Sequence, residues 1–368
     1  MDKNSMNVFI ICTGLGHINR GYESFTRECF DAIKDNKEFN LYLIKGGGKR
    51  TDREIVLPNL PRRKKATQFL AKLFPFDAYT MEQITFCIAL LPLIIFKKPA
   101  VIYYSDFTLG TYLWHLRKHL NFKYKLLFSN GAPNGPPFKT EDHVQQLLPV
   151  YLEQAISQGA PAAMQTLLPY GFNIDVAERL NAIKQKDTIR ENLGFSSNQK
   201  VIISVGTVNS HHKRMNYLIE EVAKLGETYF LVILGQFEAE TPALIALAEA
   251  KLAGRFMISS VPLEQVKSYY IAADYFVLAS LNEGFGRVLI EALSNGLPCI
   301  VHDYINAKQV LSDFGTYINM TKSGALANCL TNFHSNLTCE ELIHASYNLY
   351  SWDILKGRYI KMIKNQIL

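Results

Sequence analysis

The sequence predicts an α/β protein with two domains, each built around a doubly wound parallel sheet. The chain has 368 residues, which is too many for one domain of typical size and enough for two. Short runs of β-branched and aromatic residues alternate with amphipathic stretches of helical period, and this is the βαβ pattern. The rhythm starts again near residue 200, where a polar stretch gives way to a new apolar run.

Most of the predicted strands are apolar at consecutive positions rather than at alternating ones. Such runs are typical of strands whose two faces are both covered in a parallel sheet. Right-handed crossovers through the intervening helices would then place helices on both faces. The expected strands are 7–12, 40–44, 100–104, 124–129, 165–168, 200–205, 229–234, 255–258, 275–279, 298–301 and 315–318, and the expected helices are 20–35, 142–158, 214–226, 262–272 and 286–295.

The domain boundary is placed near residue 172. Residues 168–173 read as the end of a strand followed by turn residues, and a polar stretch then continues to Gln199. Residues 200–206 form a fresh first strand that ends at glycine. We therefore expect an N-terminal domain over residues 1–172 and a second domain from residue 173, facing each other across a cleft with ligands at the carboxyl ends of the strands.

Composition predicts a cytoplasmic globular protein without a structural metal. Apolar residues make up 48% of the chain, and its six cysteines form no CxxC pair or Cys/His ligand spacing, so reduced core cysteines are expected. The apolar run that opens the chain is too short for a signal peptide. The most apolar stretch, residues 84–96, is shorter than the roughly 20 residues that span a bilayer, and we expect a buried helix or an interfacial segment.

Positive charge is concentrated in the first half. Residues 1–172 contain 21 Lys and Arg against 14 Asp and Glu, while the remainder contains 18 against 19. The excess gathers at residues 45–53 and 62–65. These clusters are either solvated loops or contacts for an anionic acceptor or an anionic membrane surface, which would place the protein at the inner face of the membrane. No nucleic-acid partner is expected.

Three glycine-containing segments follow predicted strands. The first, residues 12–21, contains Gly14-Leu15-Gly16-His17 before an amphipathic helix, where exposed N–H groups favour an anion. It lacks the third glycine of a dinucleotide fingerprint, so a glycine turn without a ligand is the alternative. In the second, residues 206–219, Lys213 and Arg214 stand at a helix N-terminus, which opposes the helix dipole unless an anion such as a diphosphate compensates. The alternative is a solvated basic turn.

The third segment, residues 281–298, is the most specific. Glu283 lies in a loop, and Gly284-Phe285-Gly286 permits a tight turn before a helix whose first amides can face a phosphate. Glu291 is expected on the inward side of that helix, where a buried carboxylate needs hydrogen-bond donors such as a ribose diol. Helix capping with an ordinary interior salt bridge is the alternative.

Together these motifs resemble the retaining glycosyltransferases of family four (glycosyl transferases group 1), which have the GT-B fold of two Rossmann-like domains. The resemblance rests on Glu283-x7-Glu291 around Gly-Phe-Gly, on Pro169-x-Gly171-x-Asn173, on Lys213 before its helix, and on Gly296-x-Pro298. It is specific over residues 165–320. The chain end also resembles the terminal helix of this fold, which implies a second domain over residues 173–345 and a helix over 346–368 that crosses back to the first; an amphipathic tail for dimerisation is the alternative.

The resemblance implies a role for each matched residue. Glu283 would hold the donor sugar, Glu291 the ribose and Lys213 the diphosphate, while the loop that ends at Val261 would line the nucleobase. Backbone amides of Gly284, Phe285 and Gly286 would contact sugar and phosphate, and Gly16 would close over the diphosphate from the opposite domain.

Two positions depart from the family pattern. Thr207 stands where the family usually has Arg, and Arg214 is expected to take over that role in donor binding. The usual active-site histidine of the first domain is also missing. Asp106, which we assign as catalytic, and Asn130, His17 and His143 are the candidates for its place.

The resulting prediction is a retaining glycosyltransferase that needs no metal or other cofactor. It would move a hexosyl group from a nucleoside diphosphate sugar to a glycan, a lipid-linked acceptor or another hydroxyl. No metal is expected because no Asp-x-Asp-like site stands at a strand end. Cations and helix dipoles would neutralise the leaving diphosphate instead. A nucleotide-sugar epimerase of the same fold and a catalytically silent nucleotide-sugar-binding protein are the alternatives.

Overall fold

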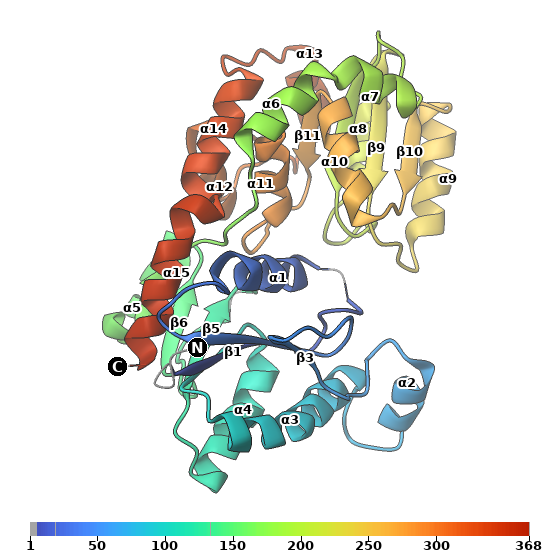
Figure 1. Ribbon diagram of the computed structural model, residues 1–368. Helices are drawn as coiled ribbons and strands as arrows, with labels where there is room; N and C mark the ends of the chain where they lie inside the picture. Colours follow the sequence, from blue (N-terminus) through green and yellow to red (C-terminus); the bar gives the residue numbers. More distant parts are fainter. Residues whose placement is uncertain (1–5, 19, 133, 368) are drawn as a thin grey trace. The chain divides into compact units, whose positions relative to one another are not determined.

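The computed structural model describes residues 6–18, 20–132 and 134–367, and it divides the chain into two compact units. Unit 1 comprises residues 1–173 and 352–368, and unit 2 comprises residues 174–351. The boundary expected near residue 172 lies beside the first of these divisions. Each unit is an α/β domain with its own sheet and core, and each is described by itself (Figure 1).

Unit 1 contains a seven-stranded sheet in the order β3-β2-β1-β4-β5-β6-β7, in which every neighbouring pair is parallel. The central strands are apolar at consecutive positions and almost wholly buried, as expected for strands covered on both faces. The strands are β1 Asn7–Cys12, β2 Asn40–Lys45, β3 Glu54–Val56, β4 Val101–Tyr104, β5 Lys125–Asn130, β6 His143–Gln146 and β7 Gln165–Leu167.

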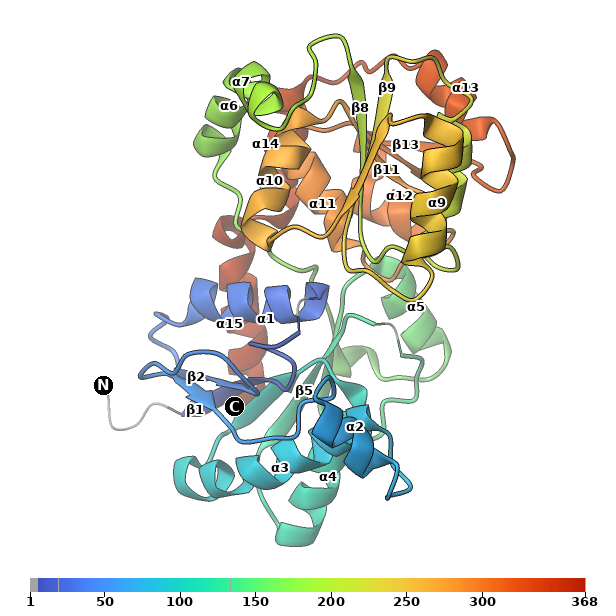
Figure 2. The same ribbon diagram turned by 90° about the vertical axis from the view of Figure 1, so that its right-hand side faces the viewer.

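Helices cover both faces of this sheet. Figures 1 and 2 show α1 and α15 on one face and α3 and α4 on the other, so the domain is doubly wound. The helices are α1 Gly21–Ile33, α2 Lys65–Ala71, α3 Ala78–Lys97, α4 Phe107–Leu120, α5 Pro149–Ser157 and α15 Trp352–Ile367, with a short 3₁₀ helix at Ala162–Met164.

Unit 2 contains a six-stranded parallel sheet in the order β10-β9-β8-β11-β12-β13. Its strands are β8 Lys200–Val205, β9 Tyr229–Leu234, β10 Phe256–Ser259, β11 Tyr275–Leu278, β12 Cys299–His302 and β13 Gly315–Ile318. Helix α8 packs on α9 and α13 over one apolar cluster, and α11 packs on α14 elsewhere in the unit. The helices are α6 Val176–Lys184, α7 Lys186–Asn192, α8 Met215–Val222, α9 Thr241–Leu252, α10 Leu263–Ala272, α11 Arg287–Ser294, α12 Ile305–Leu311, α13 Ala325–Thr331 and α14 Cys339–Tyr350, with a 3₁₀ helix at Ser312–Phe314. Two doubly wound parallel sheets are therefore present, as predicted.

The C-terminal helix α15 is fixed to unit 1 by aromatic side chains. The ring of Phe25 stacks on Tyr170 with a centroid distance of 3.8 Å and also contacts Trp352 and Tyr359. A Cβ at Gly171 would lie 2.4 Å from the Trp352 ring, so only glycine lets the chain pass so close to it. The hydroxyl of Tyr359 donates to the carbonyl of Pro169 at 2.8 Å.

The expected start of this last segment at residue 346 is six residues too early. Residues 346–351 belong to unit 2, because α14 continues to Tyr350 and the Tyr350 hydroxyl donates to the carbonyl of Val310 at 2.7 Å. The chain turns extended at Ser351, and the next helix, α15, then begins in unit 1.

The single helix expected over residues 142–158 is wrong. Residues 143–146 form the buried strand β6, and the helix α5 begins only at Pro149, which suits a first helical position. The polar side chains of β6, which made the segment unlike an apolar strand, are hydrogen-bonded. His143 Nε2 lies 2.7 Å from Thr166 Oγ1, and Gln145 Nε2 donates to Leu168 O and Tyr359 Oη.

Candidate functional site

The motifs of unit 2 meet at one edge of its sheet. All six strands are parallel, so the loops that follow them leave the sheet at the same, carboxyl edge. Residues 206–214 follow β8, residues 260–262 follow β10, and residues 279–286 follow β11. The predicted diphosphate, base and sugar residues therefore lie on loops at the same edge of one sheet, and the loops after β8 and β11 are neighbours.

The loop after β8 is organised by Asn209. Its buried side-chain oxygen accepts the N–H groups of His212 and Lys213 at 3.2 and 2.8 Å, and its amide donates to Glu238. A Cβ at Gly206 would lie 2.9 Å from Cε of Lys213. Glycine at 206 thus leaves room for the lysine stem, and the Asn209 turn fixes the backbone from which that stem rises.

Lys213 and Glu283 form an ion pair between the loops after β8 and β11. Their side chains are only 12% and 11% exposed, so the pair is largely shielded from water. Nε2 of the more exposed His212 lies 3.6 Å from the same carboxylate. Asn306 stabilises the loop after β11, because its side-chain amide donates to the carbonyl of Glu283 at 2.6 Å and to that of Gly284 at 3.3 Å.

The Gly284-Phe285-Gly286 turn joins Glu283 directly to the N-terminus of α11. Gly286 has φ +69°, which favours glycine, and it is the residue that precedes the helix. Phe285 is buried and contacts Tyr350 edge-on at a centroid distance of 6.1 Å. The aromatic anchor and the left-handed glycine aim the first turn of α11, whose amides and dipole favour an anion.

Glu291 lies one to two turns into α11 and is half-buried rather than fully buried. The inward positions belong to Leu289, Ile290 and Leu293, so the expectation of a carboxylate on the buried face is wrong in this respect. Its oxygen Oε2 accepts the hydroxyl of Tyr270 at 3.3 Å. Burial and the neighbouring Glu291 charge raise the pKa of Tyr270 well above its usual value, so Tyr270 remains a donor.

Arg214 has partners that the sequence did not predict. Its backbone has φ +53°, an uncommon conformation for a residue other than glycine. Its guanidinium donates to the carbonyls of Ala279 and Met320 at 3.2 and 3.0 Å and lies 4.6 Å from the centre of the Tyr217 ring. Arg214 therefore braces the start of α8 against the ends of β11 and β13, and its role in donor binding stays a prediction. Val261 is half-buried and lies two residues after the end of β10.

In unit 1, Gly16 belongs to two interlocked glycine loops. Gly16 has φ +99°, and a Cβ there would lie 2.2 Å from the backbone of Gly47. Gly47 donates its N–H to Leu15 O at 3.0 Å, and a Cβ at Gly46 would lie 2.0 Å from Thr13 O. The loops after β1 and β2 thus pack backbone to backbone. The run Gly46-Gly47-Gly48 directly after an expected strand was the overlooked signal for this partner loop.

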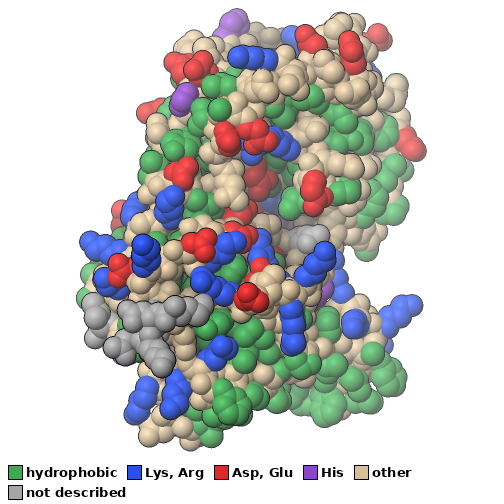
Figure 3. All heavy atoms as spheres, viewed as in Figure 1, with side chains coloured by type: hydrophobic (Ala, Val, Ile, Leu, Met, Phe, Trp, Pro, Cys, Tyr) green, Lys and Arg blue, Asp and Glu red, His purple; other side chains and the backbone are tan. Residues whose placement is uncertain are grey.

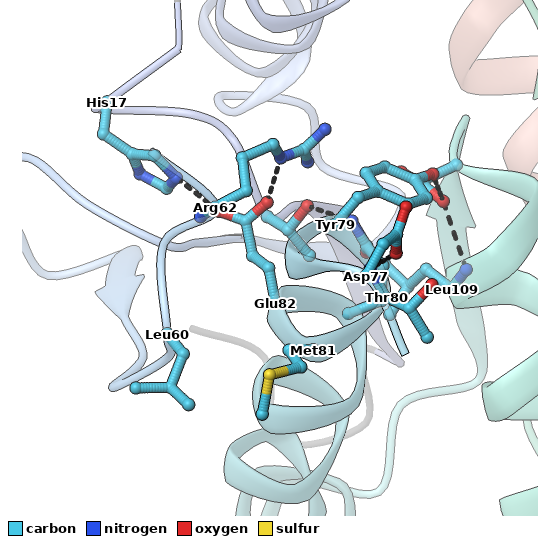
Figure 4. A network of polar contacts seen from close by, with 12 residues as sticks. His17, Leu60, Arg62, Asp77, Tyr79, Thr80, Met81, Glu82 and Leu109 are labelled. Carbon is cyan, nitrogen blue, oxygen red and sulfur yellow. Dashed lines mark hydrogen bonds and ion pairs between the residues drawn. The ribbon is translucent and has the colours of Figure 1, made fainter. Parts of the chain in front are cut away.

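A polar network runs from His17 through Glu82 and Arg62 to Tyr79 (Figure 4), and Asp106, which follows β4, is its last member. Asp106 caps α4 by accepting Leu109 N–H and also accepts the Tyr79 hydroxyl at 2.6 Å. The guanidinium carbon of Arg62 lies 4.4 Å from the centre of the Tyr79 ring. Burial raises the pKa of Asp106, and the Tyr79 bond opposes that rise.

The other end of this network is His17. Its Nε2 lies 2.6 Å from Oε1 of Glu82, a fully buried carboxylate that also pairs with Arg62. Of the four candidates for the missing histidine, the structure brings His17 and Asp106 into one network. The other two are fixed elsewhere in the sheet, because buried Asn130 bonds to Gln146 at 2.9 Å and His143 to Thr166. Burial lowers the pKa of His143.

One group of metal-ligating side chains comes together within the described ranges. Ligand atoms of His211, Glu238 and Glu240 lie within 4.8 Å of one another near the loop after β8. His211 is exposed and already bonds to Glu240 at 2.9 Å, and surface groups of this kind are common without an ion. We assign no function to it.

Comparisons with known proteins identify the C-terminal sequence pattern. Residues 185–344 match the sequence model of the family described as glycosyl transferases group 1, which is somewhat less than half of the chain. TuaC of Bacillus subtilis, whose name assigns it to teichuronic acid biosynthesis as a glycosyltransferase, is 28% identical over 203 residues, covering 55% of this chain and 50% of that protein. The alpha-galactosylglucosyldiacylglycerol synthase of Streptococcus pneumoniae is 25% identical over 46% of each chain. This chain thus spans about half the length of these relatives.

Solved structures identify the fold. HepE of Anabaena in complex with UDP and glucose has a TM-score of 0.73 at 13% identity, covering 98% of this chain and 100% of that one. Sucrose-phosphate synthase of Thermosynechococcus elongatus has a TM-score of 0.75 at 17% identity, covering 98% of each chain. The predicted resemblance to group 1 glycosyltransferases and the predicted GT-B fold of two Rossmann-like domains are confirmed.

Proposed function

We propose that this protein is a glycosyltransferase that moves a hexosyl group from a nucleoside diphosphate sugar to a hydroxyl of a glycan or a lipid-linked acceptor. The Lys213–Glu283 pair beside the glycine turn that begins α11 carries the proposal. A cation, a carboxylate and a helix N-terminus on adjacent loops suit a diphosphate that bears a sugar. The relatives support this assignment, since two are named as glycosyltransferase or glycolipid synthase and a solved neighbour holds UDP and glucose.

In the proposed reaction the bond between the anomeric carbon and the diphosphate oxygen breaks. The acceptor oxygen bonds to that carbon on the same face, and the acceptor proton leaves with the nucleoside diphosphate. Negative charge grows on the diphosphate, so Lys213 and the first amides of α11 would stabilise the transition state more than the ground state. Glu283 would hold sugar hydroxyls and Glu291 the ribose. Retention and independence from metal ions are part of the proposal.

A donor panel tests it in two steps. A nucleotide that binds only the native state raises the melting temperature, so UDP, GDP and their sugars are first ranked by thermal shift. The best donor, labelled in its sugar, is then incubated with and without a crude glycan and glycolipid acceptor fraction. Acceptor-dependent transfer with an unchanged anomeric configuration is expected. An isomerised nucleotide sugar formed without acceptor would instead identify an epimerase, and binding without turnover a silent binding protein.

A further inference from the structure

Apolar side chains are exposed together at the end of α2 and in the segment that joins it to α3. Phe69, Leu73, Phe74 and Phe76 are 64%, 66%, 54% and 43% exposed. Single exposed apolar residues are ordinary, but four within eight residues form a patch. We call these four residues together with Lys64, Lys65 and Lys72 the α2 surface.

The α2 surface is positively charged and has no acidic residue of its own. No Asp or Glu occurs from residue 55 to residue 76, a stretch that contains two Arg and three Lys. Lys64, Lys65 and Lys72 are exposed, and no carboxylate of the described part of the chain pairs with them. Figure 3 shows hydrophobic side chains gathered over α2 and α3, with Lys and Arg side chains beside the α2 end.

Several cations of the basic clusters at residues 45–53 and 62–65 bond to other groups of unit 1 and are not part of an open basic surface. Lys45 is buried and pairs with Glu54, and Arg62 pairs with buried Glu82. The guanidinium of Arg53 donates to the carbonyl of Lys34. Much of the excess charge of residues 45–53 therefore serves the fold of unit 1. Lys49, Lys64, Lys65 and Lys72 remain exposed, and the last three lie in α2 or at its two ends.

Helix α3 adds apolar surface but is held within the domain. At 20 residues it is long and apolar enough to cross a membrane by length and composition alone, and a third of its most apolar window is buried. Phe86, Leu90 and Ile94 join the core of unit 1, and buried Gln83 donates to Thr13 at 3.1 Å. The outward Ile88, Ile95 and Phe96 remain exposed. We interpret α3 as a core helix with an apolar outer side.

We propose that the α2 surface binds an anionic lipid bilayer, with the Phe and Leu side chains inserted at the headgroup boundary and the lysines among the headgroups. Exposed aromatic residues flanked by lysine are typical of interfacial membrane segments. Lysine is depleted at the centres of protein–protein interfaces, which argues against a protein as the occupant. This inference goes beyond glycosyl transfer and does not depend on it.

Vesicle flotation with the purified protein tests the proposal without any nucleotide sugar. Vesicles of phosphatidylcholine alone are compared with vesicles that also contain phosphatidylglycerol, at low and at high sodium chloride. The protein is expected to float only with the anionic vesicles and to be released by salt, because salt screens charges at the surface. Recovery in solution with both vesicles at low salt, or equal flotation with both, would overturn it.

Two triple variants locate the surface. K64S/K65S/K72S should weaken partitioning on the order of a hundredfold, because each lysine near anionic lipid is worth about fivefold. F69S/F74S/F76S should weaken it by at least about tenfold through lost apolar burial. The matched controls K184S/K251S/K322S and L120S/I156S/L349S remove the same number of exposed charges or apolar side chains elsewhere and should bind as the wild type does.

Melting temperatures and light scattering complete the test. All four variants change exposed residues and should melt within a few degrees of the wild type, so lost binding reports the surface rather than unfolding. Either α2 variant binding like the wild type would contradict the assignment. A wild-type dimer that F69S/F74S/F76S dissociates, together with absent vesicle binding, would identify a second copy of the chain as the occupant and overturn the lipid proposal.

Discussion

The ammonium of Lys213 pairs with the carboxylate of Glu283, a residue 70 positions further along the chain. In the proposed function these groups face different parts of one donor, the lysine the diphosphate and the glutamate the sugar. The pair thus holds both side chains in place, and donor binding would exchange their mutual contact for contacts with the donor. That exchange makes the two residues separable by experiment.

K213M should weaken binding of UDP by about 2–3 kcal/mol, because it removes a charged hydrogen bond to the diphosphate. E283Q should leave UDP binding equal to or tighter than that of the wild type, because it frees Lys213, but should lower turnover at least tenfold. Isothermal titration with UDP and a transfer assay measure the two effects. Equal loss of UDP affinity in both variants would show that Glu283 contributes to diphosphate binding or to folding rather than to the sugar.

E291A should weaken UDP binding by roughly 1–3 kcal/mol while the protein stays folded, because the carboxylate would lose the ribose. The analogue 2′-deoxy-UDP supplies a sharper measurement. If Glu291 bonds to the ribose hydroxyls, E291A and the deoxy change should be non-additive in a double-mutant cycle. E264A, on the exposed face of α10, is the control. Unchanged UDP affinity in folded E291A would end the assignment.

R214A tests whether Arg214 serves the fold or the donor. It would leave the carbonyls of Ala279 and Met320 without their donor, and we expect a loss of about 1–3 kcal/mol in the free energy of unfolding. R214G should lose less, because glycine relieves the positive φ. If Arg214 replaces the absent Arg at 207, R214A should also lower turnover strongly, and its combination with K213A should be non-additive. Full kcat and KM in R214A would leave only the bracing role.

D106N separates catalysis from helix capping. Asn caps a helix about as well as Asp, so the variant should keep the melting temperature of the wild type. If the Asp106 carboxylate takes part in the reaction, D106N should lower kcat at least tenfold. D106A, which removes the cap, should cost about 1 kcal/mol of stability in addition. Wild-type kcat in D106N would assign Asp106 to the cap and to Tyr79 alone.

The sheets followed from local sequence patterns. Consecutive apolar runs such as residues 200–205 and 229–234 predicted parallel strands buried on both faces, and the structure pairs them in parallel. The loops after β8 and β11 were located for the same reason, since glycines directly after such runs mark the carboxyl edge. The pairing of Lys213 with Glu283 did not follow, because it depends on which loops the sheet order places next to each other.

Several of the differences involve polar residues whose partners lie far away in the sequence. His143 and Gln145 made β6 look like a helix, because their partners Thr166 and Tyr359 lie outside any local window. Arg62 was counted as surface charge although Glu82 neutralises it inside the domain. The carbonyl partners of Arg214 were not predicted either, because its backbone angle and those contacts have no local signature. Long-range satisfaction of polar groups is the information that pattern analysis lacks.

The carboxylate of Glu54 should make the stability of unit 1 depend on pH. It accepts two bonds of 2.7 Å from Arg27 and pairs with buried Lys45, and these contacts lower its pKa to about 2. An unfolded glutamate has a pKa of about 4.3. At pH values between these two pKa values the folded state therefore binds fewer protons than the unfolded state. The stabilisation is therefore complete above about pH 4.5 and is lost as the pH falls toward 2.

E54Q should lower the free energy of unfolding by about 3 kcal/mol at pH 7, since it leaves Lys45 as an unpaired charge with a side chain only 5% exposed. The difference between E54Q and wild type should shrink as the pH is lowered from 5 toward the acid limit of folding, because the wild-type carboxylate then becomes protonated too. Melting curves of the two proteins over this range measure it. E227Q, an exposed change in unit 2, is the control and should show no such convergence. A difference that stays constant with pH would mean that Glu54 stabilises unit 1 by packing and not by its charge.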